Sequence, residues 1–156
     1  MFRHIFLVVS IVTTAACNGL NTQYGPMGLT GGYYDKALND GTTRITFVAN
    51  GISDKNFPLD AVFMRATELT LKQERKFFEV KSIKNGFDSS RSKATLIIQI
   101  LDSDPSVAPS GCDGNLDPTL GVLLPTKGTI CSALDIQPNL LKRMNPDPLP
   151  FPWARF

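Results

Sequence analysis

The hydrophobic pattern changes its period between residues 43 and 101, and this change constrains the fold more than any other feature of the chain. In residues 43–49, apolar side chains stand at every second position, which is typical of a β-strand. Asn50-Gly51 follows as a turn signal. From Pro58 the apolar residues recur every three or four positions, and this spacing predicts a helix over residues 58–75.

Two more strands are expected after this helix, at residues 76–83 and 94–101. The polar residues 85–92 between them predict a hairpin-like connection. The second strand is apolar on both faces, so we expect it to be central or covered on each side. The order strand, helix, strand, strand predicts an α+β domain over residues 43–144, with a small sheet of about three to four strands and one main helix packed on it.

Proline and glycine mark the irregular parts of the chain. Residues 102–131 contain four prolines and four glycines, which predicts a long ordered loop that can include a short strand at residues 121–124. Residues 134–144 are expected to form a short helix. Residues 145–156 have proline at nearly every second position, so this tail should be extended or polyproline-like.

The first 16 residues have the three parts of a secretory signal: a basic start, a short apolar run and small residues. The apolar run is far shorter than the roughly 20 residues of a membrane-spanning helix. Ala15-Ala16 stand directly before Cys17, and this arrangement resembles a bacterial lipobox, in which the cysteine receives a diacylglycerol and becomes the new N-terminus. The alternative is an ordinary signal peptide with an incidental cysteine. We expect a lipid-bearing Cys17, followed by a glycine-rich tether over residues 17–42.

A lipid on Cys17 determines the location that we expect for the protein. Each buried methylene contributes roughly 0.8 kcal/mol, so two or three acyl chains hold a protein firmly on a membrane. Asn18 occupies the position where an aspartate favours retention at the inner membrane. We therefore expect a periplasm-facing protein of the cell envelope, at the outer membrane in preference to the inner one.

Two cysteines remain after this segment, Cys112 and Cys131. In an oxidising periplasm such a pair predicts a disulfide. The bond would close a loop of about 20 residues and stabilise the fold by about 3 kcal/mol. A reactive or metal-binding thiol pair is the alternative, but the pair lacks a CxxC spacing, and the single histidine, His4, lies in the expected signal.

Several functional classes find no support in the sequence. The net charge of +2 gives no general attraction to nucleic acid, and a glycine-rich phosphate loop that would bind a nucleotide is missing. The chain also lacks a G-x-S-x-G motif and a histidine base beyond the signal. We therefore expect no enzyme activity, cofactor or metal, and an enzyme with an unrecognised site is the least favoured class.

Four short motifs in the first half of the chain share one spacing with a known family. They are residues 30–33, 45–51, 64–70 and 77–78, and they contain a GGY, an F-x-A-N strand end and an R-A-x-E-L-T helix segment. The pattern resembles a family of small Gram-negative bacterial lipoproteins of unknown function, over about residues 25–83. The resemblance implies a lipoprotein with an α+β fold and assigns no activity.

Arg65 and Glu68 are three positions apart on the predicted helix, close enough for an ion pair. With Tyr33 and Asn50 they could form a polar binding cluster. The alternative is a structural role, in which the pair holds the helix against the glycine-rich lead segment. Both interpretations stay open from the sequence.

Charge and aromatic residues indicate two further surfaces. Residues 72–93 carry a net charge of +4 and residues 94–126 a net charge of −4. The basic part either contacts anionic headgroups or an anionic envelope polymer, or is a solvated face. In the tail, Phe151, Trp153 and Phe156 either fold back over the sheet of their own domain or bind a partner.

The sequence thus predicts a lipid-anchored, periplasm-facing binding or structural component of the envelope, whose partners are the membrane and another envelope protein. The first alternative is a ligand- or polymer-binding module that uses the groove between helix and sheet. A deep cleft would favour this alternative.

Overall fold

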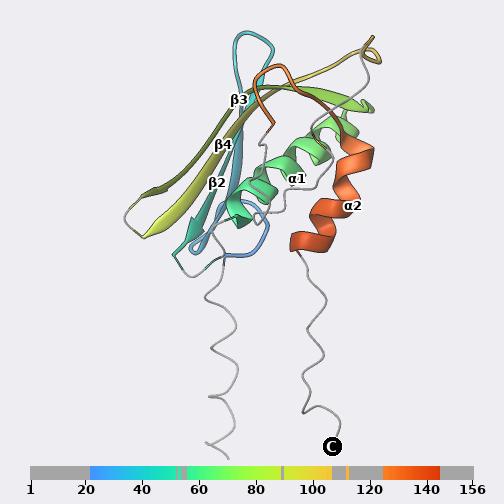
Figure 1. Cartoon of the computed structure of the whole chain (residues 1–156). Coiled ribbons are helices and arrows are strands. Elements are labelled where there is room, and N and C mark those ends of the chain that lie inside the picture. The colour runs from blue at the N-terminus through green and yellow to red at the C-terminus, as the bar shows by residue number, and fades with distance from the viewer. Residues whose placement is uncertain are drawn as a thin grey trace, which may run out of the picture.

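The computed structural model describes residues 22–51, 53, 56–88, 90–106, 112 and 125–144. Within them the chain forms one antiparallel sheet with two helices on the same side of it (Figure 1). This confirms the α+β class. The elements in chain order are β1 (Gly31–Ala37), β2 (Thr43–Asn50), α1 (Phe57–Lys72), β3 (Phe77–Asp88), β4 (Arg91–Ile100), β5 (Ile130–Ser132) and α2 (Ala133–Met144).

The sheet has five strands in the order β1-β2-β4-β3-β5, and not the three to four that the sequence predicts. The predicted strands at residues 43–49, 76–83 and 94–101 correspond to β2, β3 and β4. The two additional strands, β1 and β5, form the edges. β5 has only three residues, and the seven residues of β1 lack a clear apolar alternation, so the sequence pattern does not reveal these strands.

Strand β1 lies in the segment that the sequence predicts as a glycine-rich tether, and the structure has a strand at Gly31–Ala37. Gly31 and Gly32 both adopt positive φ angles, which side chains rarely permit. A Cβ atom on Gly31 would overlap the carbonyl oxygen of Val48, and one on Gly32 would overlap that of Pro26. The glycines therefore allow a close approach of neighbouring backbones here, whereas sequence reasoning interpreted them as loop residues.

The packed part of the chain already includes Thr22. This residue is buried, and its hydroxyl donates to the Thr30 carbonyl at 2.5 Å and accepts from the Asn50 N–H at 2.9 Å. The lead segment is thus fixed to the end of β2. Among the described residues, contacts with the domain therefore begin at Thr22.

Helix α1 begins one residue before the predicted start and ends at Lys72, three residues before the predicted end. Glu74 stops it, because its φ of 58° lies in the left-handed region that commonly ends helices. The helix covers one face of the sheet, which we call the inner face. The fully buried side chains between the helix and this face include Ile45, Phe47, Val62, Phe78, Val80, Leu96 and Ile98.

Helix α2 agrees with the short helix that the sequence predicts over residues 134–144. It packs against α1 (Figure 1). The Arg143 guanidinium contributes a hydrogen-bonded ion pair to the Asp60 carboxylate of α1 at 2.8 Å. No helix within the described part of the chain is long and apolar enough to cross a membrane.

The predicted disulfide is present and joins Cys112 to Cys131 of β5, with a sequence separation of 19 residues. Both cysteines are buried against the core. The bond therefore connects the long loop to the sheet edge. The expected strand at residues 121–124, Cys17 and the tail residues 145–156 lie outside the described residues.

Candidate functional site

A hollow of about 440 Å³ lies on the inner face at the β3–β4 hairpin. The sequence predicts a polar connection over residues 85–92, but the two strands continue to Asp88 and from Arg91. Asn85 therefore pairs with Ala94 and Phe87 with Ser92. Because Ala94 belongs to the buried face of β4, the side chains of Asn85 and Phe87 lie on the same face as the core.

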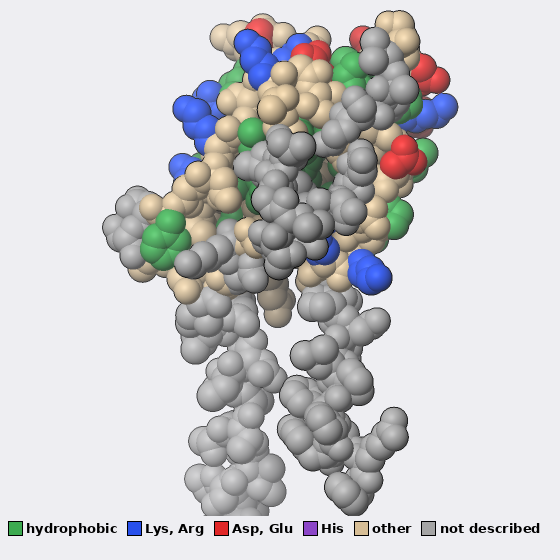
Figure 2. Space-filling view, viewed as in Figure 1, with side chains coloured by type: hydrophobic (Ala, Val, Ile, Leu, Met, Phe, Trp, Pro, Cys, Tyr) green, Lys and Arg blue, Asp and Glu red, His purple; other side chains and the backbone are tan. Residues whose placement is uncertain are grey.

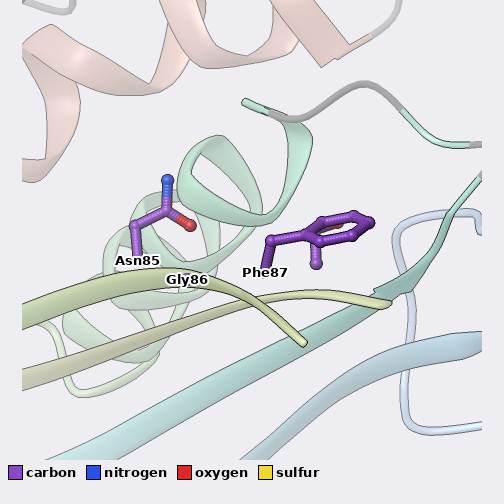
Figure 3. Close-up of a pocket in the computed structure, with 4 residues that line it drawn as sticks. Asn85, Gly86 and Phe87 are labelled. Atoms are coloured by element: carbon purple, nitrogen blue, oxygen red, sulfur yellow. The ribbon is translucent and has the colours of Figure 1, made fainter. Parts of the chain in front are cut away.

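Figure 3 shows Asn85 and Phe87 projecting from β3 toward the side of the sheet that carries α1. The hollow is thus located where the sheet continues beyond its cover of packed apolar side chains. The described residues that line it are Asn85, Gly86, Phe87 and Ser92.

The lining combines one aromatic ring with neutral polar groups. The Phe87 side chain is 62% exposed, which is costly for an aromatic ring unless something covers it. Ser92 is only 4% exposed, and its buried hydroxyl has no hydrogen-bond partner among the described residues. Such an orphaned group usually indicates a missing partner. The described lining thus offers an aromatic surface beside an amide and a hydroxyl.

The predicted cluster around Arg65 is located elsewhere, between β1 and α1. The Arg65 guanidinium donates to the Glu68 carboxylate at 2.8 Å and stacks over the Tyr33 ring at 4.3 Å. Its Nε and Nη2 atoms donate to the Asp35 carboxylate at 2.9 and 2.7 Å. Asp35 is not among the residues predicted for this cluster, because it belongs to the unexpected strand β1.

Asn50 belongs to a different network from the other three residues of the predicted cluster. Its backbone N–H donates to the Thr22 hydroxyl, and its side-chain oxygen accepts from the Ser53 hydroxyl at 3.0 Å. Asn50 thus holds the lead segment and the loop after β2. The structure brings together Tyr33, Arg65 and Glu68, and places Asn50 at the strand end.

Two opposing effects act on the pKa of Arg65. Burial lowers the pKa of Arg65, but the hydrogen bonds with Asp35 and Glu68 outweigh this effect and raise the pKa above its ordinary value. The Arg65 guanidinium thus contacts Asp35 and Tyr33 of β1 and Glu68 of α1 at the same time. This geometry fits a clamp between the edge strand and the helix.

Tyr24 extends this clamp into the core. Its ring stacks on Phe47 at 6.4 Å between centroids and tilts against Tyr33 at 5.3 Å. Burial is the main reason why the pKa of Tyr24 is raised, and the nearby Glu68 carboxylate adds to the effect. The hydroxyl makes no hydrogen bond of standard length and angle to the described residues.

A metal site is not formed by the residues that the structure describes, because no group of three His, Cys, Asp or Glu side chains converges in them. Comparison with models of protein families, with curated proteins and with solved structures gives no match for this chain.

Proposed function

We propose that the protein is a lipid-anchored component of the cell envelope that faces the periplasm and acts in binding or assembly. The observation that carries this proposal is the order of an apolar run, Ala15-Ala16 and Cys17 at the N-terminal side of the folded domain. The same order supports the proposed membership in the small lipoprotein family, and with Asn18 it favours the outer membrane.

The disulfide between Cys112 and Cys131 supports the same compartment. Disulfides persist in oxidising environments such as the bacterial periplasm and are rare in the cytosol. A binding or structural role, with another envelope protein as the partner, agrees with a small domain that has no recognised catalytic motif. The aromatic tail residues Phe151, Trp153 and Phe156 remain proposed contacts for such a partner.

Metabolic labelling with an alkyne palmitate analogue tests the anchor. Wild-type protein should incorporate the label, and the Cys17→Ser variant should not. The double variant Cys112→Ser/Cys131→Ser is the matched control, because it removes thiols without touching the proposed site and should keep the label. An unlabelled wild-type protein that is expressed and exported contradicts the proposal.

The hollow favours a second candidate function, a module that binds a neutral saccharide. A sugar ring presents C–H groups on one side, which pack on an aromatic ring, and hydroxyls at its edge, which pair with amides and hydroxyls. Phe87 and Asn85 supply these two kinds of contact from one face of β3. Pockets that combine an apolar surface with a few polar groups are typical ligand sites.

Chemical-shift perturbation in the labelled protein tests this candidate, with chitotriose as the neutral saccharide probe. Binding should shift signals of the β3–β4 hairpin, and Phe87→Ala should weaken it by about tenfold or more, since an aromatic contact contributes about 1.5 kcal/mol or more. Tyr34→Ala is the matched control, because Tyr34 is a half-exposed aromatic residue outside the lining. Equal losses in both variants, or shifts away from the hairpin, contradict a site in the hollow.

A further inference from the structure

The face of the sheet opposite the helices carries several exposed cationic side chains, and we call it the open face. Alternation along the strands defines it: Ile45 and Phe47 of β2 and Leu96 and Ile98 of β4 point into the core, so the residues between them point away from the helices. The open face in its central part consists of Tyr34, Lys36, Arg44, Thr46, Lys84, Lys93, Thr95 and Ile97.

Four of these residues are exposed cations: Lys36, Arg44, Lys84 and Lys93. None of them forms an ion pair with the residues that the structure describes. Glu79 is the acidic residue among the strand residues of this face whose side chains the structure describes. Its carboxylate already pairs with the Lys81 ammonium at 2.7 Å. Figure 2 shows several Lys and Arg side chains on the sheet side of the molecule, at the left.

The strand register places two of these cations directly opposite each other, which is unfavourable for a face that only contacts solvent. Lys36 lies directly opposite Arg44 in the β1–β2 pair. Like charges at facing positions of a sheet destabilise it, so the pair does not serve the fold. An anionic partner would remove this repulsion.

We propose that the open face docks on the anionic headgroups of a lipid bilayer. The four cations come from four different strands, Lys36 from β1, Arg44 from β2, Lys84 from β3 and Lys93 from β4. This distribution covers an area and not a line, so it matches a surface of many headgroups better than one polymer strand. Each Lys or Arg near an anionic membrane contributes to attraction that salt screens.

The choice of a bilayer as the partner also depends on the proposed anchor. Cys17 and Thr22 are five positions apart, and Thr22 is already packed into the domain. A fully extended chain of this length spans at most about 18 Å. A lipid on Cys17 would therefore keep the domain next to the headgroups, where even a weak surface attraction orients it.

Vesicle flotation of the full chain with Cys17→Ser tests the docking without any lipid anchor. The probes are vesicles of equal parts phosphatidylglycerol and phosphatidylcholine, and vesicles of phosphatidylcholine alone. The second type reports binding through the N-terminal apolar run. The measured quantity is the partition coefficient for the anionic vesicles divided by that for the phosphatidylcholine vesicles. The Cys17→Ser chain carries no lipid anchor. A failure of palmitate labelling therefore refutes the anchor, whereas a failure of vesicle binding refutes the docking of the open face.

The test variant is Lys36→Gln/Arg44→Gln/Lys84→Gln/Lys93→Gln. Its ratio should fall on the order of a hundredfold or more, since each charge contributes about fivefold. The matched control removes the same charge elsewhere, with Lys72→Gln/Lys76→Gln/Lys127→Gln/Lys142→Gln, all at exposed residues outside the open face. It should lose far less. An equal loss in both variants, a ratio near one for the Cys17→Ser chain with its open face unchanged, or binding to soluble heparin without binding to the anionic vesicles overturns the proposal.

Discussion

The two faces of the sheet differ in what their side chains do. On the inner face, Phe47, Phe78 and Leu96 are completely buried under α1. On the open face, Arg44 and Lys93 alternate with them along the same strands and remain exposed. One face of an antiparallel sheet can thus supply the hydrophobic core while the other faces solvent or a partner. Mutations on the two faces should therefore affect stability and surface binding separately.

The largest effect should come from the inner face. Phe47→Ala removes a fully buried ring that contacts Tyr24 and Phe57, and it should lower the free energy of unfolding by about 3–5 kcal/mol. Thr95→Ala on the open face is the control, and it should cost no more than about 1 kcal/mol. Urea denaturation measures both. Similar losses in the two variants would show that the open face is also part of the core.

The second effect concerns the long loop at the sheet edge. Cys112→Ser/Cys131→Ser should lower the free energy of unfolding by about 3 kcal/mol, because the bond closes a loop of 19 residues. The wild type should show the same loss in the presence of reductant, and the double variant should not respond to reductant. An unchanged stability after reduction is the contrary result.

Sequence periodicity was sufficient to predict the inner face. The alternation in residues 43–49 and the helical spacing after Pro58 report burial directly, so the bounds of β2 agree to within one residue and those of α1 to within three. Strand β1 was missed, because Gly31 and Gly32 serve a close backbone approach that depends on distant partners. β5 was missed because three residues are too few for a pattern.

The candidate sites were predictable to the same limited extent. The spacing of Arg65 and Glu68 gave their ion pair, since three positions on a helix bring side chains together. Asp35 and the hollow depend on strand pairing, which a local pattern does not contain. Phe87 was the available signal for the hollow, an aromatic residue within a polar stretch.

A smaller effect should appear at Tyr24, where the inner face meets β1. Its pKa is raised above the ordinary value near 10, so the unfolded chain loses this proton before the folded protein does. The contribution of Tyr24 to the free energy of unfolding is therefore complete below pH 10 and decreases as the pH rises above this value. Tyr24→Phe should not lower the stability at pH 7, because the hydroxyl lacks a standard hydrogen bond.

Denaturation of this variant and of the wild type between pH 7 and alkaline pH checks this prediction, with pH 10 as the point where the curves should begin to separate. The wild type should lose stability more steeply above that pH than Tyr24→Phe. Parallel curves would mean that Tyr24 does not titrate differently in the two states. A strong loss at pH 7 would indicate a hydrogen bond to the hydroxyl that matters for folding.

The most direct test of the separation between the two faces is the stability of the variant that lacks the four open-face cations. We expect urea denaturation of Lys36→Gln/Arg44→Gln/Lys84→Gln/Lys93→Gln to give a free energy of unfolding within about 1 kcal/mol of the wild type, or above it, since the repulsion between Lys36 and Arg44 is removed. A loss of about 3 kcal/mol or more, similar to that of Phe47→Ala, would contradict the account, because the open face would then be needed for the fold.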